Sequence, residues 1–464
     1  MIDSKVTNYK NIHKENIPYI ITWTLFYAWM LIFFTWWVNS FKTSEIFAEK
    51  ELYGIYILLL VFIATIAFFI KPKKFKEYIN RGGVGLLLVL AAYFILEKLG
   101  LVAISKILLV LLPCFLGITY LGLLSVFIYI MNNTEKFFTI IIGNALIAIL
   151  ILLHDYQIFH INNSYHFIFA TLFFSMLPTI KFKTEDFIAE EKVYSKTAPQ
   201  ISKYMYMSMF INCIILVFCR GVGRGYLLTI NDLYPYNLEI SFYYGGFIGV
   251  ITMFIIYGFV KRSNSVTLNL IFGTFLFSIF LHFFSDTEIF QRLFATFMGI
   301  STTMSTAYIY YTLGVVSKKY WSITYIKFNI FLIAVVGCGL GSLLGNYIYS
   351  EQGLISKHIM LMSIAIIITM VIISPLLNIT FFNDDWQEDS VMANIDNLNI
   401  RQFQKYNLTT KEIEVCHYML ENLTVRQIAI NMGISENTVK FHKKRIFEKL
   451  NISSKEEIFN KINA

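Results

Sequence analysis

Charged residues are scarce in this chain of 464 residues. Asp, Glu, Lys and Arg make up 15% of it, whereas they make up about a quarter of an average soluble protein. Apolar residues account for 56%, and seven Pro and 24 Gly are too few for a fibrous or low-complexity chain. This composition excludes an ordinary soluble protein and predicts an integral membrane protein.

Cysteine is also scarce, with five residues that stand singly and form no CxxC pair. Structural zinc sites and redox pairs use closely spaced cysteines, so we expect neither. His417 and His442 lack a second ligand at metal-binding spacing, so we expect no metal site in the C-terminal segment either. The chain also lacks a Walker loop, a kinase signature and a Ser-His-acid order. We therefore expect no enzyme activity and no cofactor.

Long apolar runs are abundant. A bilayer core needs about 20 apolar residues per helix, and twelve runs meet this requirement. The longest internal polar connection, KFKTEDFIAEEKVYSKTAPQISK, divides them six and six. The runs are residues 20–38, 52–70, 82–99, 107–131, 137–153, 161–180, 204–219, 240–260, 266–284, 293–316, 328–349 and 359–377.

Lys and Arg concentrate in alternate loops between these runs. KPKKFKEYINR follows the second run and SKKYW follows the tenth, whereas HDYQIFHINNSYH, between the fifth and sixth, contains neither residue type. Cytoplasmic loops are enriched in Lys and Arg. We therefore predict a multi-pass protein of the inner (cytoplasmic) membrane with both termini in the cytoplasm.

Ionisable residues are nearly absent from the centres of the runs, and we expect the charged residues Glu97, Lys98, Lys106, Arg220, Arg224, Asp286 and Glu288 at their outer ends. Because an intramembrane acid is typical of a proton path, its absence favours a sensor over a proton-coupled pump. Uncharged polar side chains remain near the midplane, where hydrogen bonding between helices is their simplest role. As candidates for ligand sensing we take Asn144, Asn212, Thr302 and Thr303.

Residues 378–407 are polar and acidic, and we interpret them as a cytoplasmic linker. Beyond the linker, a cap hydroxyl followed three residues later by Glu or Gln marks several helix starts. Apolar residues at helical spacing give each helix an inward face, so residues 408–464 are predicted to form a small domain of four helices. The marked starts are Thr409 with Glu412, Thr424 with Gln427, Ser435, and Ser453 with Glu456.

The helix that begins at Ser435 is strongly basic. Its sequence, ENTVKFHKKRIFEKL, contains four lysines and one arginine, which suits the neutralisation of DNA phosphates. An amphipathic helix at a membrane surface is the alternative. That alternative gives no role to the preceding helix or to the turn at Gly433, so DNA binding is favoured.

The segment LTTKEIEVCHYMLENLTVRQIAINMGISENTVKFHKKRIFEKLNISSKEEI, residues 408–458, resembles the helix-turn-helix of the LuxR family of bacterial transcription regulators. Its departures are mild: Lys411 and Lys455 stand where the family usually has Arg, and Asn422 stands for a Gly. The resemblance implies that the helix after Ser435 lies in the major groove of double-stranded DNA. It implies base contacts for Lys440, Phe441 and Lys444, and phosphate contacts for Thr438, Lys443 and Lys449. With Ser435, these are the predicted DNA-binding residues.

Twelve spans divided six and six about a long cytoplasmic loop resemble the major facilitator architecture. The loop KPKKFKEYINRGG keeps mainly the basic character of that family's signature loop, and another twelve-span fold is the alternative. The expected fold is all-α: a polytopic bundle of about twelve transmembrane helices, then a small four-helix LuxR-type domain. The expected domains are residues 1–377, 378–407 and 408–464.

These features predict a membrane-embedded one-component transcription regulator, whose bundle senses a small-molecule signal and whose tail binds promoter DNA. Two alternatives stay open: a solute transporter with a regulatory DNA-binding tail, and a bundle that holds the DNA-binding domain until proteolysis frees it. The expected partners are double-stranded DNA, the lipid bilayer and the signal. A homodimer on DNA is a further expectation, because one such domain contacts only a half-site.

Overall fold

The computed structural model divides the chain into two units, Met1–Trp386 and Gln387–Ala464. Within the described residues every regular element is a helix. We treat the two units, here called the bundle and the tail, separately. The described residues are 12–33, 63, 65–67, 69–158, 165–188, 191, 203–231, 234–259, 263–284, 287–319, 321, 340, 406, 408–420, 425–432, 434–452, 454 and 457–458.

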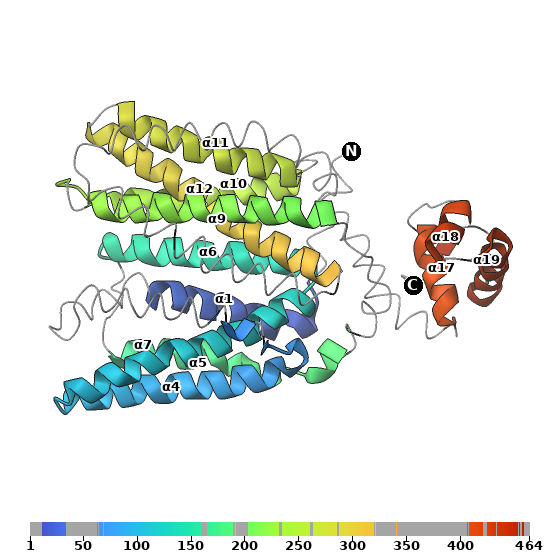
Figure 1. Cartoon of the computed structure of the whole chain (residues 1–464), viewed down its shortest axis with the longest axis horizontal. Coiled ribbons are helices and arrows are strands. Elements are labelled where there is room, and N and C mark those ends of the chain that lie inside the picture. Colours follow the sequence, from blue (N-terminus) through green and yellow to red (C-terminus); the bar gives the residue numbers. More distant parts are fainter. Residues whose placement is uncertain are drawn as a thin grey trace. The chain divides into compact units, whose positions relative to one another are not determined.

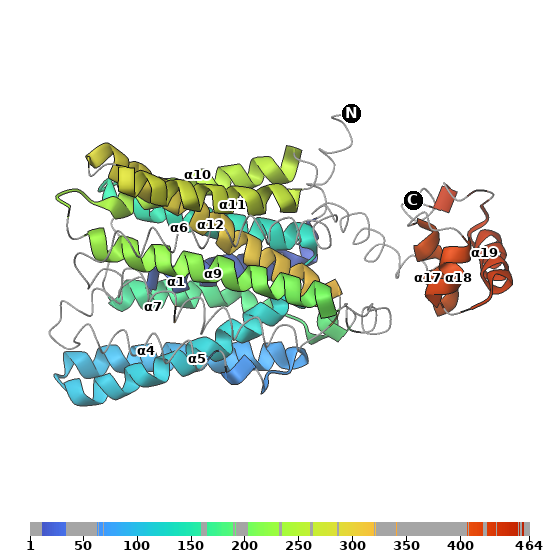
Figure 2. The same ribbon diagram turned by 45° about the horizontal axis from the view of Figure 1, so that its top comes forward.

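The described helices of the bundle lie side by side along its length (Figures 1 and 2). They coincide with nine of the twelve predicted runs, whereas the second, eleventh and twelfth runs lie largely or wholly outside the described residues. The helices are α1 (Ile17–Ile32), α4 (Phe75–Lys98), α5 (Val102–Tyr129), α6 (Asn133–Asp155), α7 (Tyr165–Met176), α9 (Lys203–Asn231), α10 (Leu238–Phe259), α11 (Ser263–Phe284) and α12 (Glu288–Lys319).

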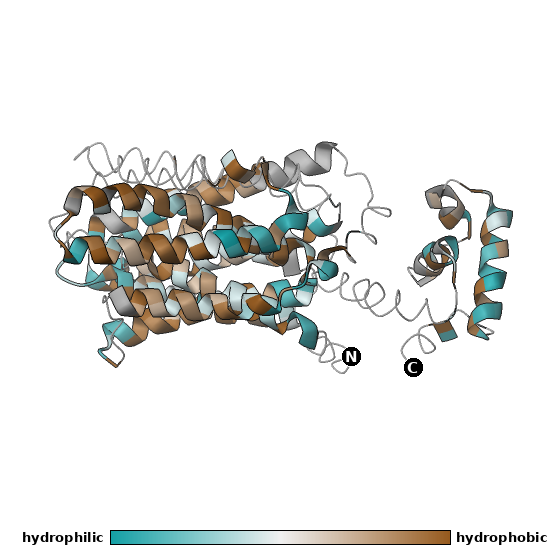
Figure 3. Cartoon of the chain, turned by 90° about the horizontal axis from the view of Figure 1, so that it is seen from below, coloured by the Kyte–Doolittle hydropathy of each residue, from teal (hydrophilic) through white to brown (hydrophobic). Residues whose placement is uncertain are grey.

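The outward surface of the bundle is apolar (Figure 3). On α4, for example, Leu88 is 65% exposed, and Val84 and Ile95 are exposed at helical spacing beside it. Contiguous apolar surface of this kind is unstable in water and suits contact with lipid. Among the described residues, four helices are long and apolar enough to cross a membrane: Pro72–Lys98, Ala103–Tyr129, Asn133–Asp155 and Leu238–Gly258. The expectation of a multi-pass membrane bundle is confirmed.

The predicted end of the seventh run was wrong. Helix α9 continues from residue 219 to Asn231, so Arg220 lies near its middle and not at an outer end. The apolar pattern is interrupted by two arginines, but both are bound within the bundle: Arg220 donates to Thr306 (2.7 Å), and Arg224 pairs with Glu239 (3.0 Å). Because partners from neighbouring helices solvate these charges, the helix continues through them.

Helix α12 contacts α5, α6, α9, α10 and α11. Residues four apart on a helix form a ridge, and one ridge of α12 carries, in order, Thr302, Thr306, Tyr310, Gly314 and Lys318. Tyr310 connects this ridge to α5 by a hydrogen bond, because its hydroxyl is 2.7 Å from that of Tyr120. We refer to these five residues as the α12 ridge.

Two buried lysines join α12 to the end of α5 and the start of α6, at the end of the bundle where α1 begins. The Lys136 ammonium donates to the Gly314 carbonyl (3.0 Å), and the Lys318 ammonium lies 3.5 and 3.4 Å from the carbonyls of Ile130 and Met131. These two carbonyls directly follow α5, where the helix dipole places negative potential. The lysine charges therefore stabilise the contact of α12 with the end of α5 and the start of α6.

The neighbouring start of α6 carries a capping box. Glu135 accepts from the Asn132 amide (2.9 Å) and Asn132 accepts from the Glu135 amide (2.8 Å). The same buried carboxylate also accepts from the His13 backbone amide (2.9 Å) and from the Asn16 side chain (2.8 Å). Glu135 thus ties the start of α1 to the start of α6.

Helices α10 and α12 approach closely at two glycines. A Cβ added at Gly245 would overlap the Thr296 carbonyl, and one added at Gly299 would overlap the Phe242 carbonyl. Small residues at such a crossing allow helix backbones to pack within a membrane, where the hydrophobic effect does not drive helices together. This contact holds α12 against α10.

We expect Gly299→Ala to destabilise the bundle by about 1–3 kcal/mol, because the new methyl forces the two backbones apart. Gly273→Ala on α11 is the control, since a Cβ there meets nothing within 4 Å. Thermal unfolding of the full-length protein in detergent measures both. Equal stability of the Gly299 variant and the wild type would show that the close crossing is not needed.

The tail contains α17 (Thr410–Leu420), α18 (Val425–Met432) and α19 (Glu436–Leu450). Buried residues from all three, including Val415, Ile428 and Ile446, form one core that is separate from the core of the bundle. The caps at Thr409 and Ser435 are confirmed. The predicted caps at Thr424 and Ser453, with most of the fourth helix, lie outside the described residues.

Candidate functional site

Ser435 sets the start of α19, the basic helix of the tail. Its hydroxyl accepts from the Thr438 amide (3.1 Å) and lies 2.8 Å from the Thr438 hydroxyl, which is the N-cap geometry. Val439, Ile446 and Leu450 are buried against the other two helices. The cap and this apolar stripe together fix which face of α19 points outward.

The outward face of α19 carries Lys440, Phe441 and Lys444, all of which are exposed. Phe441, an apolar residue, is 54% exposed, and the Arg445 guanidinium lies 5.1 Å from its ring centroid. The three residues for which base contacts were predicted therefore share one free face of the helix. An exposed aromatic ring among cations suits a groove in which base edges and methyl groups are read.

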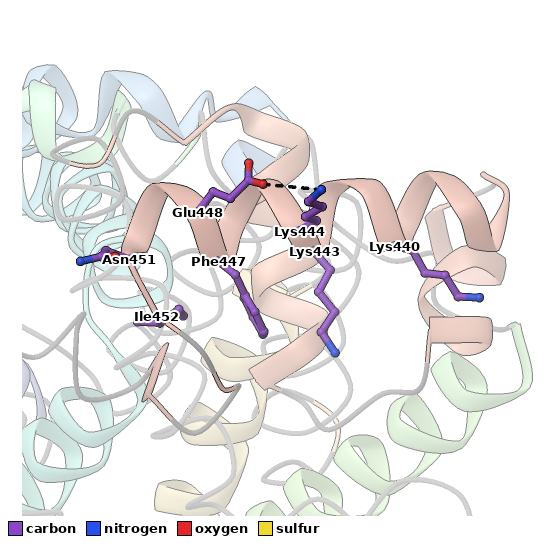
Figure 4. Close-up of a pocket in the computed structure, with 7 residues that line it drawn as sticks. All are labelled: Lys440, Lys443, Lys444, Phe447, Glu448, Asn451 and Ile452. Carbon is purple, nitrogen blue, oxygen red and sulfur yellow. Dashed lines mark ion pairs between the residues drawn. The ribbon is translucent and has the colours of Figure 1, made fainter.

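A shallow groove runs along the second half of α19 (Figure 4). Lys443 extends along Phe447, with its ammonium 5.4 Å from the ring centroid, whereas Lys444 turns toward Glu448 (4.0 Å). An exposed ion pair of this length contributes little stability, so the Lys444 side chain can leave it for another anion. The groove is lined by Lys440, Lys443, Lys444, Phe447, Glu448, Asn451 and Ile452.

Lys449 lies differently from the other lysines of α19. Its ammonium is 2.7 Å from Glu412 Oε2 on α17, and only 31% of its side chain is exposed. Glu412 also accepts from the Thr409 amide (2.7 Å) in the first turn of α17. Lys449, a predicted phosphate contact, thus holds two helices of the tail together.

The pKa of the Glu412 carboxyl reflects this contact. Burial acts to raise it, but the hydrogen bonds from Lys449 and Thr409 outweigh burial and hold the pKa below its ordinary value. A lowered carboxyl pKa contributes stability above the ordinary carboxyl pKa, and that contribution is lost as the pH falls through the folded-state pKa. The pair therefore stabilises the tail at neutral pH and not in acid.

The structure describes the side chains of three of the four residues predicted to sense a ligand. The Asn144 amide donates to the carbonyl of Ile140 in its own helix (2.9 Å), and Thr303 packs against the α10 glycines Gly246 and Gly249. Thr302 lies on the α12 ridge, and the Asn212 side chain is outside the described residues. Sequence reasoning placed Arg220 at an outer end of its run, because it directly follows the apolar stretch that ends at Cys219, whereas it lies near the middle of α9.

The fold and the outward face of α19 define a multi-pass membrane protein with a helix-turn-helix tail. Residues 406–461 match the family described as bacterial regulatory proteins, luxR family. The tail is therefore a LuxR-type DNA-binding domain, as the resemblance implied.

Two curated relatives match short parts of the chain. "Probable transcriptional regulator ycf29" of Guillardia theta is 37% identical over 75 residues, which cover 15% of this chain and 36% of the relative. A protein of Aeromonas salmonicida, named as an HTH-type transcriptional regulator in the exeN 3′ region, is 40% identical over 53 residues, 11% of this chain and 27% of the relative. The chain thus spans only about a third of the length of these relatives.

The bundle is similar to a solved transporter. The crystal structure of FucP, a major facilitator superfamily transporter in the outward conformation, aligns with a TM-score of 0.54 and 13% identity. The alignment covers 79% of this chain and 99% of that chain. This likeness confirms the expected fold class, and at this identity it concerns the fold alone.

We expect Lys449→Met to lower the stability of the tail by about 1–3 kcal/mol, because the buried Glu412 carboxylate loses its charged partner. Lys411→Met is the control, since the Lys411–Glu414 pair lies at the surface (3.0 Å, with 57% of the lysine exposed) and should change stability by about 0.5 kcal/mol at most. Urea denaturation of the Gln387–Ala464 fragment measures both. Equal losses in the two variants would show that Lys449 is an ordinary surface lysine.

Proposed function

We propose that the protein is a membrane-embedded one-component transcription regulator. The bundle senses a small-molecule signal, and the tail binds promoter DNA from the membrane. The observation that carries the proposal is a LuxR-type domain joined within one chain to a major-facilitator-like bundle. The bias of Lys and Arg among the loops supports an inner-membrane protein with both termini in the cytoplasm, which places the tail on the side of the DNA.

Three features of α19 support its role in reading DNA. Its outward face is cationic and lacks buried apolar contacts, its N-terminus is fixed by the Ser435 cap, and its opposite face is anchored in the tail core. A recognition helix needs a rigid mounting, because base contacts require fixed side-chain positions. We assign base contacts to Lys440, Phe441 and Lys444, and a phosphate contact to Lys443.

We expect Lys440→Ala or Lys444→Ala to reduce discrimination between bound genomic sites and random DNA by about 1–3 kcal/mol. Lys443→Ala should instead weaken binding to all sequences alike and lower the salt dependence by about 0.9 in the log–log slope. Titration of the Gln387–Ala464 fragment with both DNAs at several salt concentrations measures these effects. The base-contact assignment fails if all three variants lose affinity equally on both DNAs.

We further propose that two tails act together on DNA. One helix-turn-helix contacts a half-site, and useful affinity generally needs a second domain about 34 Å away, one turn of the DNA helix. Association of two bundles in the membrane raises the effective concentration of the second tail without any new DNA contact. We assign the contact between tails to the segment after Ser453.

We expect a single cysteine at Asn460 to crosslink between chains in whole cells under conditions in which target genes respond. The natural Cys416 in the tail is buried, and burial raises the pKa of its thiol to about 12, so it should not contribute. The unmodified protein is the control. Target genes that respond without any crosslink in any condition would exclude the pairing and favour a monomer or a tail released by proteolysis.

A solute transporter with a regulatory tail is the second candidate, and the likeness of the bundle to FucP favours it. The two candidates differ in one observable. A transporter accumulates its solute in membrane vesicles, whereas a sensor binds its signal without net uptake.

A further inference from the structure

Arg445 is a basic residue of α19 to which no DNA contact has been assigned. It follows Phe441 by four residues, and its side chain is exposed. Lys444, by comparison, has the carboxylate of Glu448 at 4.0 Å. Within the part of the chain that the structure describes, no carboxylate pairs with Arg445, and its guanidinium lies instead over the ring of Phe441. The donors of this guanidinium are therefore available to a partner outside the chain.

The Phe441 ring determines where the guanidinium lies. The central carbon of the guanidinium is 5.1 Å from the ring centroid, and Phe441 itself is exposed. A cation over an aromatic face is attracted by the ring, and a guanidinium stacked in this way keeps the N–H donors along its edge free. Arg445 thus presents a planar set of donors beside an exposed apolar ring.

Arg445 also leaves the helix in nearly the same direction as Phe441. An α-helix turns by about 100° per residue, so two residues four apart lie about 40° from each other around the helix axis. Lys440, a predicted base contact, lies about 100° from Phe441 on the same scale. Neither Arg445 nor Phe441 belongs to the apolar stripe that packs on the tail core. Arg445 is therefore aligned with Phe441 more closely than Lys440 is.

This alignment favours a base over a phosphate as the partner of Arg445. Phe441 is uncharged, and the contact that suits it in the major groove is with the methyl group of a thymine. Successive base pairs are about 3.4 Å apart, so a guanidinium 5.1 Å from the ring centroid lies within about two base pairs of that thymine. The ring holds the guanidinium at the depth of the base edges, whereas a phosphate contact requires the side chain to extend toward the DNA backbone.

We propose that Arg445 reads a guanine in the major groove, within about two base pairs of a thymine whose methyl group contacts Phe441. Guanine presents two acceptors in this groove, O6 and N7, and the planar fork of an arginine binds both. Because the ring orients the fork before DNA is bound, less conformational freedom is lost on binding. Arg445 is thus a specificity-determining residue that Phe441 positions. This inference rests on the proposed function, because it names the bases that the tail recognises.

Selection from a random library of double-stranded DNA tests the assignment. The full-length protein in detergent is mixed with the library, and the bound DNA is sequenced. The wild type should select a motif in which a guanine lies within about two base pairs of a thymine. Arg445→Met should select the same motif without the guanine, and its preference for guanine over adenine at that position should fall about 5- to 100-fold. Because Arg445 is exposed, this substitution should leave the tail folded.

Base analogues in the selected site identify the contacting atoms. 7-Deazaguanine lacks N7 but keeps O6, so it should weaken binding of the wild type about 3- to 30-fold and leave Arg445→Met unaffected. Uracil in place of the thymine removes one methyl group and should weaken the wild type about 2- to 5-fold, but not Phe441→Ala. Arg445→Lys, which keeps the charge without the planar fork, should retain only part of the guanine preference.

Arg426→Met provides the matched control. Arg426 is an exposed arginine of α18, so this substitution removes the same charge without changing α19. The variant should keep the guanine preference of the wild type, and any loss of affinity should be equal on all sequences.

Three outcomes would overturn the inference alone. The wild-type motif has no guanine near a thymine, or Arg445→Met selects the wild-type motif unchanged. In the third, Arg445→Met loses affinity equally on all sequences and the log–log salt slope falls by about 0.9, which would make Arg445 a phosphate contact. A wild-type protein that selects no motif would instead contradict the proposed function, and this inference with it.

Discussion

The contact of the α12 ridge with the helices around it organises the bundle. The close crossing at Gly245 and Gly299 seats α12 against α10. Along the ridge, Thr306 accepts from the Arg220 guanidinium and Tyr310 contacts Tyr120. Gly314 and Lys318 then make the two buried lysine contacts with the start of α6 and the end of α5. Each of these polar contacts gives a hydrogen-bond partner to a group that has no water to bind in the membrane interior.

The tail holds α19 rigidly and leaves the outward face of that helix exposed. The described part of the tail contributes ten buried residues to its core, and the Glu412–Lys449 pair adds a directional contact between α17 and α19. This contact distinguishes Lys449 from Lys440 and Lys444, which are exposed on the outward face of α19. This distinction follows from burial and could not be deduced from charge alone.

Sequence reasoning reached the fold class and the tail because both depend on strong local signals. Apolar runs of membrane-spanning length predicted nine helices that the structure describes, and the Thr409 and Ser435 caps predicted two helix starts of the tail. Sequence reasoning failed where contacts with other helices determine how far a helix extends. The end of α9 was placed too early because Arg220 and Arg224 interrupt the apolar pattern, and their partners Thr306 and Glu239 are remote in sequence.

The central claim is that the chain acts on DNA while it is held in the membrane. Chromatin immunoprecipitation with sequencing, performed on the full-length protein in its host cell, tests this claim most directly when the recovered protein is also sized. The account predicts discrete genomic sites bound by the full-length chain, and the loss of these sites in a Lys440→Ala, Lys444→Ala double variant with unchanged membrane levels. Enrichment that is absent, unaffected by the double variant, or carried only by a released tail fragment would contradict it.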